Sequence, residues 1–484
     1  MALAKGRFRF LIAAIGFAAF LAMNSFSLWG FSDLPQRAFG TDTSGYWTIP
    51  LQLSNVATFL LYCMGSRIVP HLTNRIPFPE AVLLISCGMI LLLGFFLSSN
   101  LPLLVAAGIL VGAGTTCCFI CWEHVFSFGS PRQGEHRIIA GSAASILAFA
   151  LLFSFGDGTL LFSVALLAFV NLALLYASLA AERRDLEEEP SAAPFKPATL
   201  SDLKTRFGKP LLCIVMIGII SPVLGDAALP QPLALEESCL LVLSANLLSA
   251  LILGIIWFVF RRKTSISRTY VILFPLLVTA LLLLPFIAAP FRIVIIFIGS
   301  FSFTFFSIIM MVWCITAAKQ WHMGLTGVYA LFGGVTYGSR MVGLWLASAI
   351  SGSSLSQETQ IFASVAILLY GCSLVMFVLA RKGAEKTASD TSTATPSGTD
   401  VLREVCQQLV EEYGLSPRQS EVLDLLVHGY DVPSTAKKLF ISENTVRTHM
   451  KKIYTLMDVH SKQEIIDAVN ERCGERCGHE RSNS

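Results

Sequence analysis

Basic and polar side chains gather on one face of a predicted helix close to the C-terminal end of the chain. Apolar residues recur there at steps of four, three and four: Val446, Met450, Ile453 and Met457. Arg447, Thr448 and Lys451 therefore lie on the other face. An α-helix fits the major groove of B-form DNA, where Arg or Lys can donate to guanine and Thr can contact a base or a thymine methyl group. The residues at the helix start and flank suit contacts to phosphate: Asn444, Thr445 and Lys452.

Charge supports this interpretation only locally. Residues 400–484 hold 11 Lys and Arg against 14 Asp and Glu, whereas residues 432–457 hold five basic residues and one acidic residue. The basic residues therefore coincide with the predicted nucleic-acid face. A solvated helix face without a partner would carry the same charge, so the surrounding elements must decide between the two interpretations.

Start and stop signals predict four short helices in this region. The first is expected over 416–429, the second over 433–440 and the third over 442–457. The fourth begins at Ser461, where Glu464 completes a capping box. A lead-in helix is expected before them, over 401–414. The second and third helices, joined by a short turn, form a helix-turn-helix.

The segment 415–468 resembles the LuxR-type (GerE-like) helix-turn-helix family. The matching residues are Leu415, Pro417, Arg418, Glu421, Val422, Leu423, Leu426, Gly429, Ala436, Leu439, Ile441, Ser442, Thr445, Val446, Arg447, His449, Ile453, Tyr454, Val459 and Ser461. The resemblance implies double-stranded promoter DNA as partner, with Arg447, Thr448 and Lys451 as base readers. It also implies a homodimer, because the fourth helix of this family often pairs two copies on a two-fold site. The chain departs from the family pattern at Gln419, where Glu is usual, and at Asp458, where Gly is usual.

The rest of the chain has the composition of a membrane protein. Hydrophobic residues make up 54% of the sequence and charged residues 14%, against roughly 25% charged residues in soluble domains. A spanning helix needs about 20 apolar residues. Twelve such runs lie near 8–30, 45–69, 79–99, 101–126, 137–156, 159–181, 210–229, 239–260, 270–289, 291–317, 324–351 and 359–380. The expected fold is all-α: a polytopic bundle of about twelve spans, followed by a soluble four-helix domain.

Composition also divides the chain into domains. A membrane domain is expected over 1–381, with spans one to six in 8–181, a polar cytoplasmic loop over 182–209 and spans seven to twelve in 210–380. Residues 382–400 are rich in Ser, Thr, Gly and Pro and predict a flexible linker. The helix-turn-helix domain is expected over 401–472 and a tail over 473–484. The twelve cysteines predict no disulfide framework, because most lie inside apolar runs.

The placement of Lys and Arg predicts the orientation in the cell membrane. If the N-terminus is cytoplasmic, the inside segments carry 21 Lys and Arg up to Lys386 and the outside segments carry two, Arg37 and Arg292. The positive-inside rule then places both termini in the cytoplasm.

The six-plus-six layout resembles the major facilitator superfamily. The loop after the second span lacks the Asp that this family usually carries, as does the equivalent loop at Arg261–Lys263. The whole layout is similar to membrane-embedded LuxR-type regulators of gut Actinobacteria, in which the membrane domain is thought to sense small molecules. Three functions therefore stay open for the bundle: a sensor of a small-molecule ligand, a transporter with a regulatory tail, and a passive anchor.

Few polar residues lie inside the predicted spans. Arg340 is the deep cation, and it is expected to contact an anionic or phenolic ligand or to pair with a carboxylate on another helix. Glu123 and His124 lie near a cytoplasmic end, where an interfacial pair is expected rather than a proton relay. The sequence contains no catalytic triad, P-loop or dinucleotide fingerprint. It therefore predicts neither an enzyme nor a cofactor or metal site.

Overall fold

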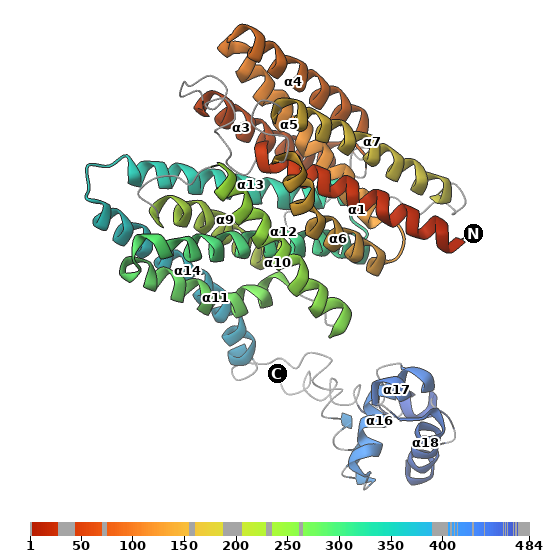
Figure 1. Ribbon diagram of the computed structural model, residues 1–484. Helices are drawn as coiled ribbons and strands as arrows, with labels where there is room; N and C mark the ends of the chain where they lie inside the picture. Colours follow the sequence, from red (N-terminus) through yellow and green to blue (C-terminus); the bar gives the residue numbers. More distant parts are fainter. Residues whose placement is uncertain are drawn as a thin grey trace. The chain divides into compact units, whose positions relative to one another are not determined.

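The computed structural model divides the chain into two compact units, Met1–Ala380 and Arg381–Ser484 (Figure 1). Each unit is described by itself. The structure describes residues 2–27, 44–69, 75–153, 160–186, 206–228, 235–260 and 265–389, and most of 405–472. The predicted tail at 473–484 and most of the predicted loop at 182–209 lie outside the described residues.

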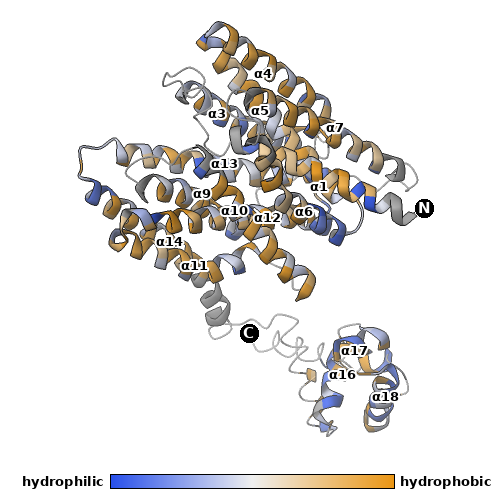
Figure 2. Ribbon diagram, in the orientation of Figure 1, coloured by the Kyte–Doolittle hydropathy of each residue, from blue (hydrophilic) through white to orange (hydrophobic). Residues whose placement is uncertain are grey.

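The first unit is a bundle of long helices. The first half contains α1 (Ala2–Ser27), α3 (Ser44–Ile68), α4 (Phe78–Ser98), α5 (Leu101–Ser127), α6 (Pro131–Phe153) and α7 (Leu160–Leu186). The second half contains α9 (Gly208–Ala228), α10 (Leu235–Gly254, continued by a π turn at Ile255–Val259), α11 (Ile266–Leu283), α12 (Ile293–Trp321), α13 (Leu325–Ser351) and α14 (Gln357–Ser389). The predicted six-plus-six helical layout is confirmed. Within the described residues, nine segments are long and apolar enough to cross a membrane, and these helices are coloured mostly hydrophobic in Figure 2.

Burial depends on a helix's place within its half. The fourth helices, α5 and α12, have 67% and 61% of their apolar window buried. The third and sixth helices of both halves, α4, α7, α11 and α14, are only 28–33% buried. Apolar side chains such as Phe169 on α7 and Tyr370 on α14 are exposed. Because the same positions are interior or peripheral in both halves, the halves are built alike, and the peripheral helices present the apolar surface that lipid requires.

Three long helices do not reach the spanning criterion: α3, α6 and α13. Each carries polar residues in its interior, such as Asn55 on α3 and Ser142 on α6, both buried. Helix α3 packs against α13 and α6 packs against α10, so these pairs join the two halves. Their polar side chains face protein rather than lipid, which explains how less apolar helices fit into the bundle.

Small residues allow the closest helix contacts in the bundle. A Cβ added to Gly112 on α5 would lie 2.2 Å from the carbonyl oxygen of Leu51 on α3. A Cβ added to Gly218 on α9 would lie 2.0 Å from the hydroxyl oxygen of Ser339 on α13. Glycine at these two contacts permits van der Waals packing of the backbones, which drives helix association where lipid removes the hydrophobic effect.

An ion cluster joins four helices of the first half. Arg137 on α6 donates to the Glu182 carboxylate on α7 at 2.7 Å and to the Val125 carbonyl on α5 at 3.1 Å. Arg9 on α1 lies 3.7 Å from the same carboxylate. The Arg137 and Glu182 side chains are 7% and 10% exposed. Because these side chains are shielded from water, each charge needs its counterion. Either charge alone would be buried without compensation.

The predicted boundary between membrane domain and linker, at residues 381 and 382, lies within one residue of the division into compact units at Ala380 and Arg381. The linker was expected from residue 382, but α14 continues to Ser389. Residues 381–389 contain Ala, Glu and Lys, which favour helix. Extending an existing helix avoids the cost of nucleation. Residues 390–400 of the predicted linker lie outside the described residues.

The second unit contains the short helices α16 (Pro417–Val427), α17 (Val432–Leu439) and α18 (Glu443–Met457). A further helical stretch follows over 463–467, and helical residues precede α16 at 405, 406, 409, 410 and 412. The Ser461 hydroxyl accepts from the Glu464 amide at 3.2 Å and donates to its carboxylate at 2.9 Å, so the predicted capping box is present. Gln419 makes the equivalent box with Ser416, its side-chain oxygen accepting from the Ser416 amide at 2.7 Å. An amide at Gln419 therefore replaces the usual carboxylate without loss of the cap.

Candidate nucleic-acid interface and central cavity

Helix α18 is held in the second unit by its apolar face. Val446, Ile453 and Met457 are buried in the core of this unit, and Met450 is partly buried against it. Helices α16 and α17 both pack on α18. The apolar stripe predicted from the sequence is therefore the buried face, and it fixes which residues of α18 point outward.

All six residues predicted to contact DNA lie at the exposed surface of α18. They are Asn444, Thr445, Arg447, Thr448, Lys451 and Lys452. Among them are three cations and three short polar side chains on a single helix. Such a surface has the donors, acceptors and methyl groups that base edges and phosphates require.

Four of these residues have local partners: Asn444, Thr445, Arg447 and Thr448. The Arg447 guanidinium lies 3.1 Å from the Glu443 carboxylate and donates to the Asn444 side-chain oxygen at 3.3 Å. The Thr448 hydroxyl donates to the Asn444 backbone carbonyl at 2.8 Å. Because its proton is engaged, Thr448 presents a methyl group and acceptor lone pairs. These suit a thymine methyl group or an amino group of adenine or cytosine.

The start of α18 is fixed by a serine cap at Ser442 and by a hydrogen bond from Arg418. The Ser442 hydroxyl accepts from the Thr445 amide at 3.1 Å. Arg418 on α16 donates to the Leu439 carbonyl at the end of α17 at 2.7 Å. This bond ties α16 to the turn that leads into α18. In the sequence, Arg418 stood out only as a match to the family. Its bond to Leu439, 21 residues away, could not be predicted because it leaves no local pattern.

The bundle contains a small central cavity of about 40 Å³. Its lining comes from α1, α5, α6, α10, α12 and α13, so both halves contribute. The aromatic walls are Phe17, Phe119, Phe303, Tyr329 and Tyr337, and the polar groups include Ser142, Asn246, Thr304, Ser307 and Thr336. The lining is mostly apolar, with five aromatic side chains and a few polar groups, and small-molecule sites have linings of this kind.

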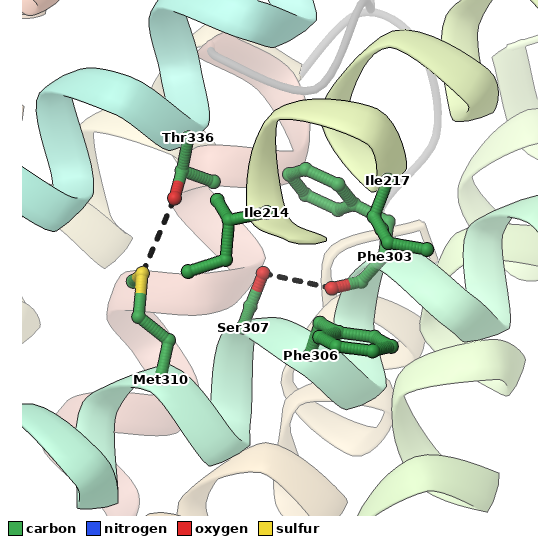
Figure 3. A pocket seen from close by; sticks show the side chains of 7 residues that line it. All are labelled: Ile214, Ile217, Phe303, Phe306, Ser307, Met310 and Thr336. Carbon is green, nitrogen blue, oxygen red and sulfur yellow. Dashed lines mark hydrogen bonds between the residues drawn. The ribbon is translucent and has the colours of Figure 1, made fainter. Parts of the chain in front are cut away.

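A smaller pocket shares one wall with this cavity. Figure 3 shows its lining residues from α9, α12 and α13. The hydroxyl of Ser307 donates to the Phe303 carbonyl at 2.9 Å, and that of Thr336 donates to the Phe332 carbonyl at 2.8 Å and contacts the Met310 sulfur at 3.2 Å. These hydroxyl protons are engaged, so both residues offer acceptor lone pairs to the enclosed space.

Arg340 lies in a recess lined by Gln52, Asn55, Tyr337, Arg340 and Met341. Its guanidinium carbon lies 5.2 Å from the centre of the Phe303 ring, a cation–π contact. Tyr337 lines both the recess and the cavity. The Asn55 amide nitrogen donates to Thr116 at 2.8 Å, and its buried side-chain oxygen has no hydrogen-bond partner among the described residues. The recess thus combines a cation with an available acceptor, and Asn55 was not singled out from the sequence.

No group of three or more His, Cys, Asp or Glu side chains within the described part of the chain could hold a metal ion. The side chains at the two candidate sites offer hydrogen bonds, charge and aromatic contacts.

Comparisons with known proteins identify both units by class. Residues 414–469 match the family described as "Bacterial regulatory proteins, luxR family", so the second unit contains a DNA-binding helix-turn-helix domain of LuxR type. The bundle has the fold of the major facilitator superfamily. It superposes on the superfamily's proton:xylose symporter XylE with a TM-score of 0.52 at 11% identity, covering 78% of this chain and 96% of that chain. A bacterial homologue of the iron transporter ferroportin in its outward-facing state gives 0.52 at 14% identity, covering 77% and 98%.

Curated relatives match the helix-turn-helix region alone. The chain is 42% identical over 53 residues to the oxygen regulatory protein NreC of Staphylococcus haemolyticus, which is 11% of this chain and 24% of the relative. The NreC proteins of two Staphylococcus epidermidis strains are 40% identical over 53 residues, again 24% of their length. The chain thus spans about a quarter of the curated relatives that it matches.

Proposed function

We propose that this protein is a membrane-anchored one-component transcription regulator. A small molecule binds in the bundle and shifts its conformation, and this shift changes how the helix-turn-helix domains pair or reach promoter DNA. The observation that carries the proposal is that one chain holds both a DNA-binding domain and a membrane bundle with an aromatic central cavity. Both termini are cytoplasmic in this proposal, in keeping with 21 Lys and Arg on the inner segments against two on the outer ones.

DNA recognition is assigned to the outer surface of α18. Arg447, Thr448 and Lys451 read base edges, while Asn444, Thr445 and Lys452 contact phosphate. Two copies pair through the helix that begins at Ser461 and bind a two-fold operator as a homodimer. The exposure of these six side chains on one capped helix supports the assignment.

Chromatin precipitation of the full-length protein in cells tests the DNA-binding part. Sharp peaks at a few promoters are expected, and the Arg447→Ala/Lys451→Ala variant should lose them. Arg476→Ala/Arg481→Ala removes the same charge outside the region matched to the family and should keep the peaks. Equal occupancy in all three proteins would contradict the proposed recognition surface.

Ligand recognition is assigned to the central cavity and the Arg340 recess. The aromatic walls offer contacts to a ring, Arg340 attracts an anionic or phenolic oxygen, and the Asn55 oxygen accepts a hydrogen bond from a donor group. A panel of aromatic carboxylates and phenols should raise the unfolding temperature of the purified protein, because a ligand that binds only the folded state stabilises it. Arg340→Ala should lose this stabilisation and Arg340→Lys should keep part of it. Equal stabilisation of wild type and Arg340→Ala would refute the role of Arg340.

A transporter with a regulatory tail is the second candidate, favoured by the major facilitator fold. It predicts substrate uptake by vesicles containing a protein truncated after Ser389. The regulator predicts instead that the panel members changing the unfolding temperature also change promoter occupancy. Substrate uptake without any change in promoter occupancy would show that the bundle is a transporter and not a sensor.

A further inference from the structure

The two halves of the bundle meet in a closed seam at one end of α5. We define the seam by Glu123, His124 and Ser127 on α5, with Lys319 on α12 and Thr326 on α13. The His124 ring lies 2.9 Å from the Thr326 hydroxyl, and the Lys319 ammonium donates to the Ser127 carbonyl at 2.6 Å. These contacts join helices of the first half to helices of the second. The seam is therefore a place where relative movement of the halves must break polar contacts.

Glu123 is buried inside this seam. The sequence predicted an interfacial pair, and this prediction is wrong, because Glu123 is 0% exposed and His124 is 3% exposed. Depth along a helix places a residue near a bilayer surface, but packing against α12 and α13 decides whether water reaches it. Neither carboxyl oxygen of Glu123 has a hydrogen-bond partner among the described residues.

The groups that surround Glu123 do not balance a negative charge. Cys314 on α12 and Tyr329 on α13 lie close enough to interact with it electrostatically, and both are neutral groups at physiological pH. Two cations that contact other residues of α5 are engaged there: Arg137 on α6 bonds to Glu182 and the Val125 carbonyl, and Lys319 bonds to the Ser127 carbonyl. His124 beside it on α5 contacts Thr326. An ionised carboxylate in this position would be a buried charge without compensation.

Burial of such a charge costs several kcal/mol, whereas the neutral acid costs far less. The closed seam therefore holds Glu123 as the neutral acid. Separation of the halves at the seam admits water, and a hydrated glutamate ionises above a pH of about 4.3. The carboxyl O–H bond then breaks, the electron pair stays on Glu123, and the proton passes to water or to a buffer base.

We propose that Glu123 is a proton-binding site whose proton is held while the seam is closed and released when the seam opens. The proton is then a second ligand of the bundle, distinct from the small molecule in the central cavity. By linkage, acid favours the closed seam and alkali favours the open one. Any ligand that stabilises the closed seam must equally favour proton uptake, because coupling between two ligands is reciprocal.

His124 is the competing titratable group, and it predicts the opposite sign. A buried imidazole is favoured in its neutral form, so its protonation would open the seam in acid instead of closing it. The direction of the pH response therefore separates Glu123 from His124 before any variant is made. Loss of the Lys319 proton would break its bond to the Ser127 carbonyl and would share the sign expected for Glu123, so Lys319→Gln is the control for that group. DNA binding plays no part in this inference, so it stands or fails independently of the proposed function.

Hydrogen–deuterium exchange of the full-length protein in phosphatidylcholine vesicles tests the proposal. Exchange of peptides covering 119–129 and 314–329 is measured from acid to alkaline pH and corrected for the chemical exchange rate. Wild type should lose protection as pH rises, by up to about tenfold per pH unit. Glu123→Gln mimics the neutral acid and should stay protected throughout, while His124→Gln should keep the wild-type response.

Three results would overturn the proposal: protection that is flat in wild type, protection that increases with pH, or a wild-type response in Glu123→Gln. If Glu123→Gln does not fold, Lys319→Gln decides between the two groups that share this sign: a pH response that persists in Lys319→Gln supports Glu123, and its loss overturns the proposal. If protection rises with pH and His124→Gln abolishes the rise, the titrating residue is His124.

Discussion

The membrane bundle and the C-terminal domain place their charged and apolar side chains on opposite sides of their helices. In the bundle, Arg137 and Glu182 are nearly inaccessible, while Phe169 and Tyr370 are 69% and 74% exposed. In the C-terminal domain, Leu423 is wholly buried and the cations of α18 are exposed. Both units are helical, so secondary structure does not explain the difference. The medium around each unit does: lipid accepts exposed rings and excludes charge, whereas water does the reverse.

The largest expected effect comes from a charge removed inside the bundle. Arg137→Ala leaves the Glu182 carboxylate buried beside Arg9 alone and should destabilise the protein by about 3–5 kcal/mol. Arg132→Ala removes the same charge from an exposed position of α6 and should change stability by less than about 0.5 kcal/mol. Thermal unfolding of the purified full-length proteins measures both. Similar unfolding temperatures for the two variants would show that the buried ion pair does not hold the four helices together.

The matching change in the C-terminal domain removes an apolar side chain. Leu423→Ala opens a cavity in the core of the domain and should cost it about 2–5 kcal/mol. Leu456 is 46% exposed on α18, so Leu456→Ala should cost far less. Hydrogen exchange of peptides from 415–457 in the full-length protein reports the loss of protection. Comparable exchange in both variants would argue that the described core does not stabilise the domain.

A smaller effect is expected where an exposed cation is removed from the same domain. Arg447→Ala should weaken binding to an operator identified by chromatin precipitation by about 1–3 kcal/mol, because one base contact is lost. The free energy of unfolding should hardly change, since Arg447 pairs only at the surface. Fluorescence anisotropy with labelled operator DNA and thermal unfolding test the two halves of this prediction. A loss of stability as large as that of Leu423→Ala would show that Arg447 is structural.

The smallest expected effect is on the pH dependence of the stability of the C-terminal domain, through the pair formed by Glu412 and Arg472. Hydrogen bonding from Arg472 lowers the pKa of the Glu412 carboxyl below its ordinary value. A carboxyl with a depressed pKa stabilises the folded state above its unfolded pKa, and this contribution disappears as pH falls through the folded pKa. The domain should therefore lose a small increment of stability in acid, and Glu412→Gln should remove that part of the pH dependence. Hydrogen exchange of peptides around 405–415 at several pH values measures it; an unchanged profile in Glu412→Gln would exclude the pair as the cause.

The helices could be predicted from the sequence where lipid or local capping imposes a recognisable residue pattern. The twelve predicted runs correspond to twelve long helices within the described residues, and nine of these are apolar enough to cross a membrane. A span needs about 20 apolar residues, so composition alone marks most of them. Helix α6 begins at Pro131, six residues before the expected start at 137, because its first turns are polar and lie outside the apolar run. In the C-terminal domain, serine caps at 416, 442 and 461 marked helix starts, since capping depends on neighbouring residues only.

Features built from distant residues could not be predicted from the sequence. The lining of the central cavity comes from six helices, and an aromatic residue such as Phe17 or Phe119 in an apolar run carries no mark of facing a cavity. The burial of Glu123 depends on which face of α5 meets α12 and α13. The bond from Arg418 to Leu439 depends on how α16 meets α17. Each of these depends on tertiary packing, which local periodicity does not encode.

The pair formed by Glu443 and Arg447 gives the proposed recognition helix an internal counterion. When a DNA phosphate takes over a free arginine, a cation condensed on the DNA is released to bulk solvent, and this release makes binding strongly dependent on salt. At Arg447 the approaching phosphate meets the neighbouring carboxylate of Glu443, which opposes a second anion. The uncharged acceptor edge of guanine meets less opposition. In the proposed function, Arg447 should therefore contribute less to binding of arbitrary DNA than to binding of a matching site. The domain should then spend less time on wrong sequences.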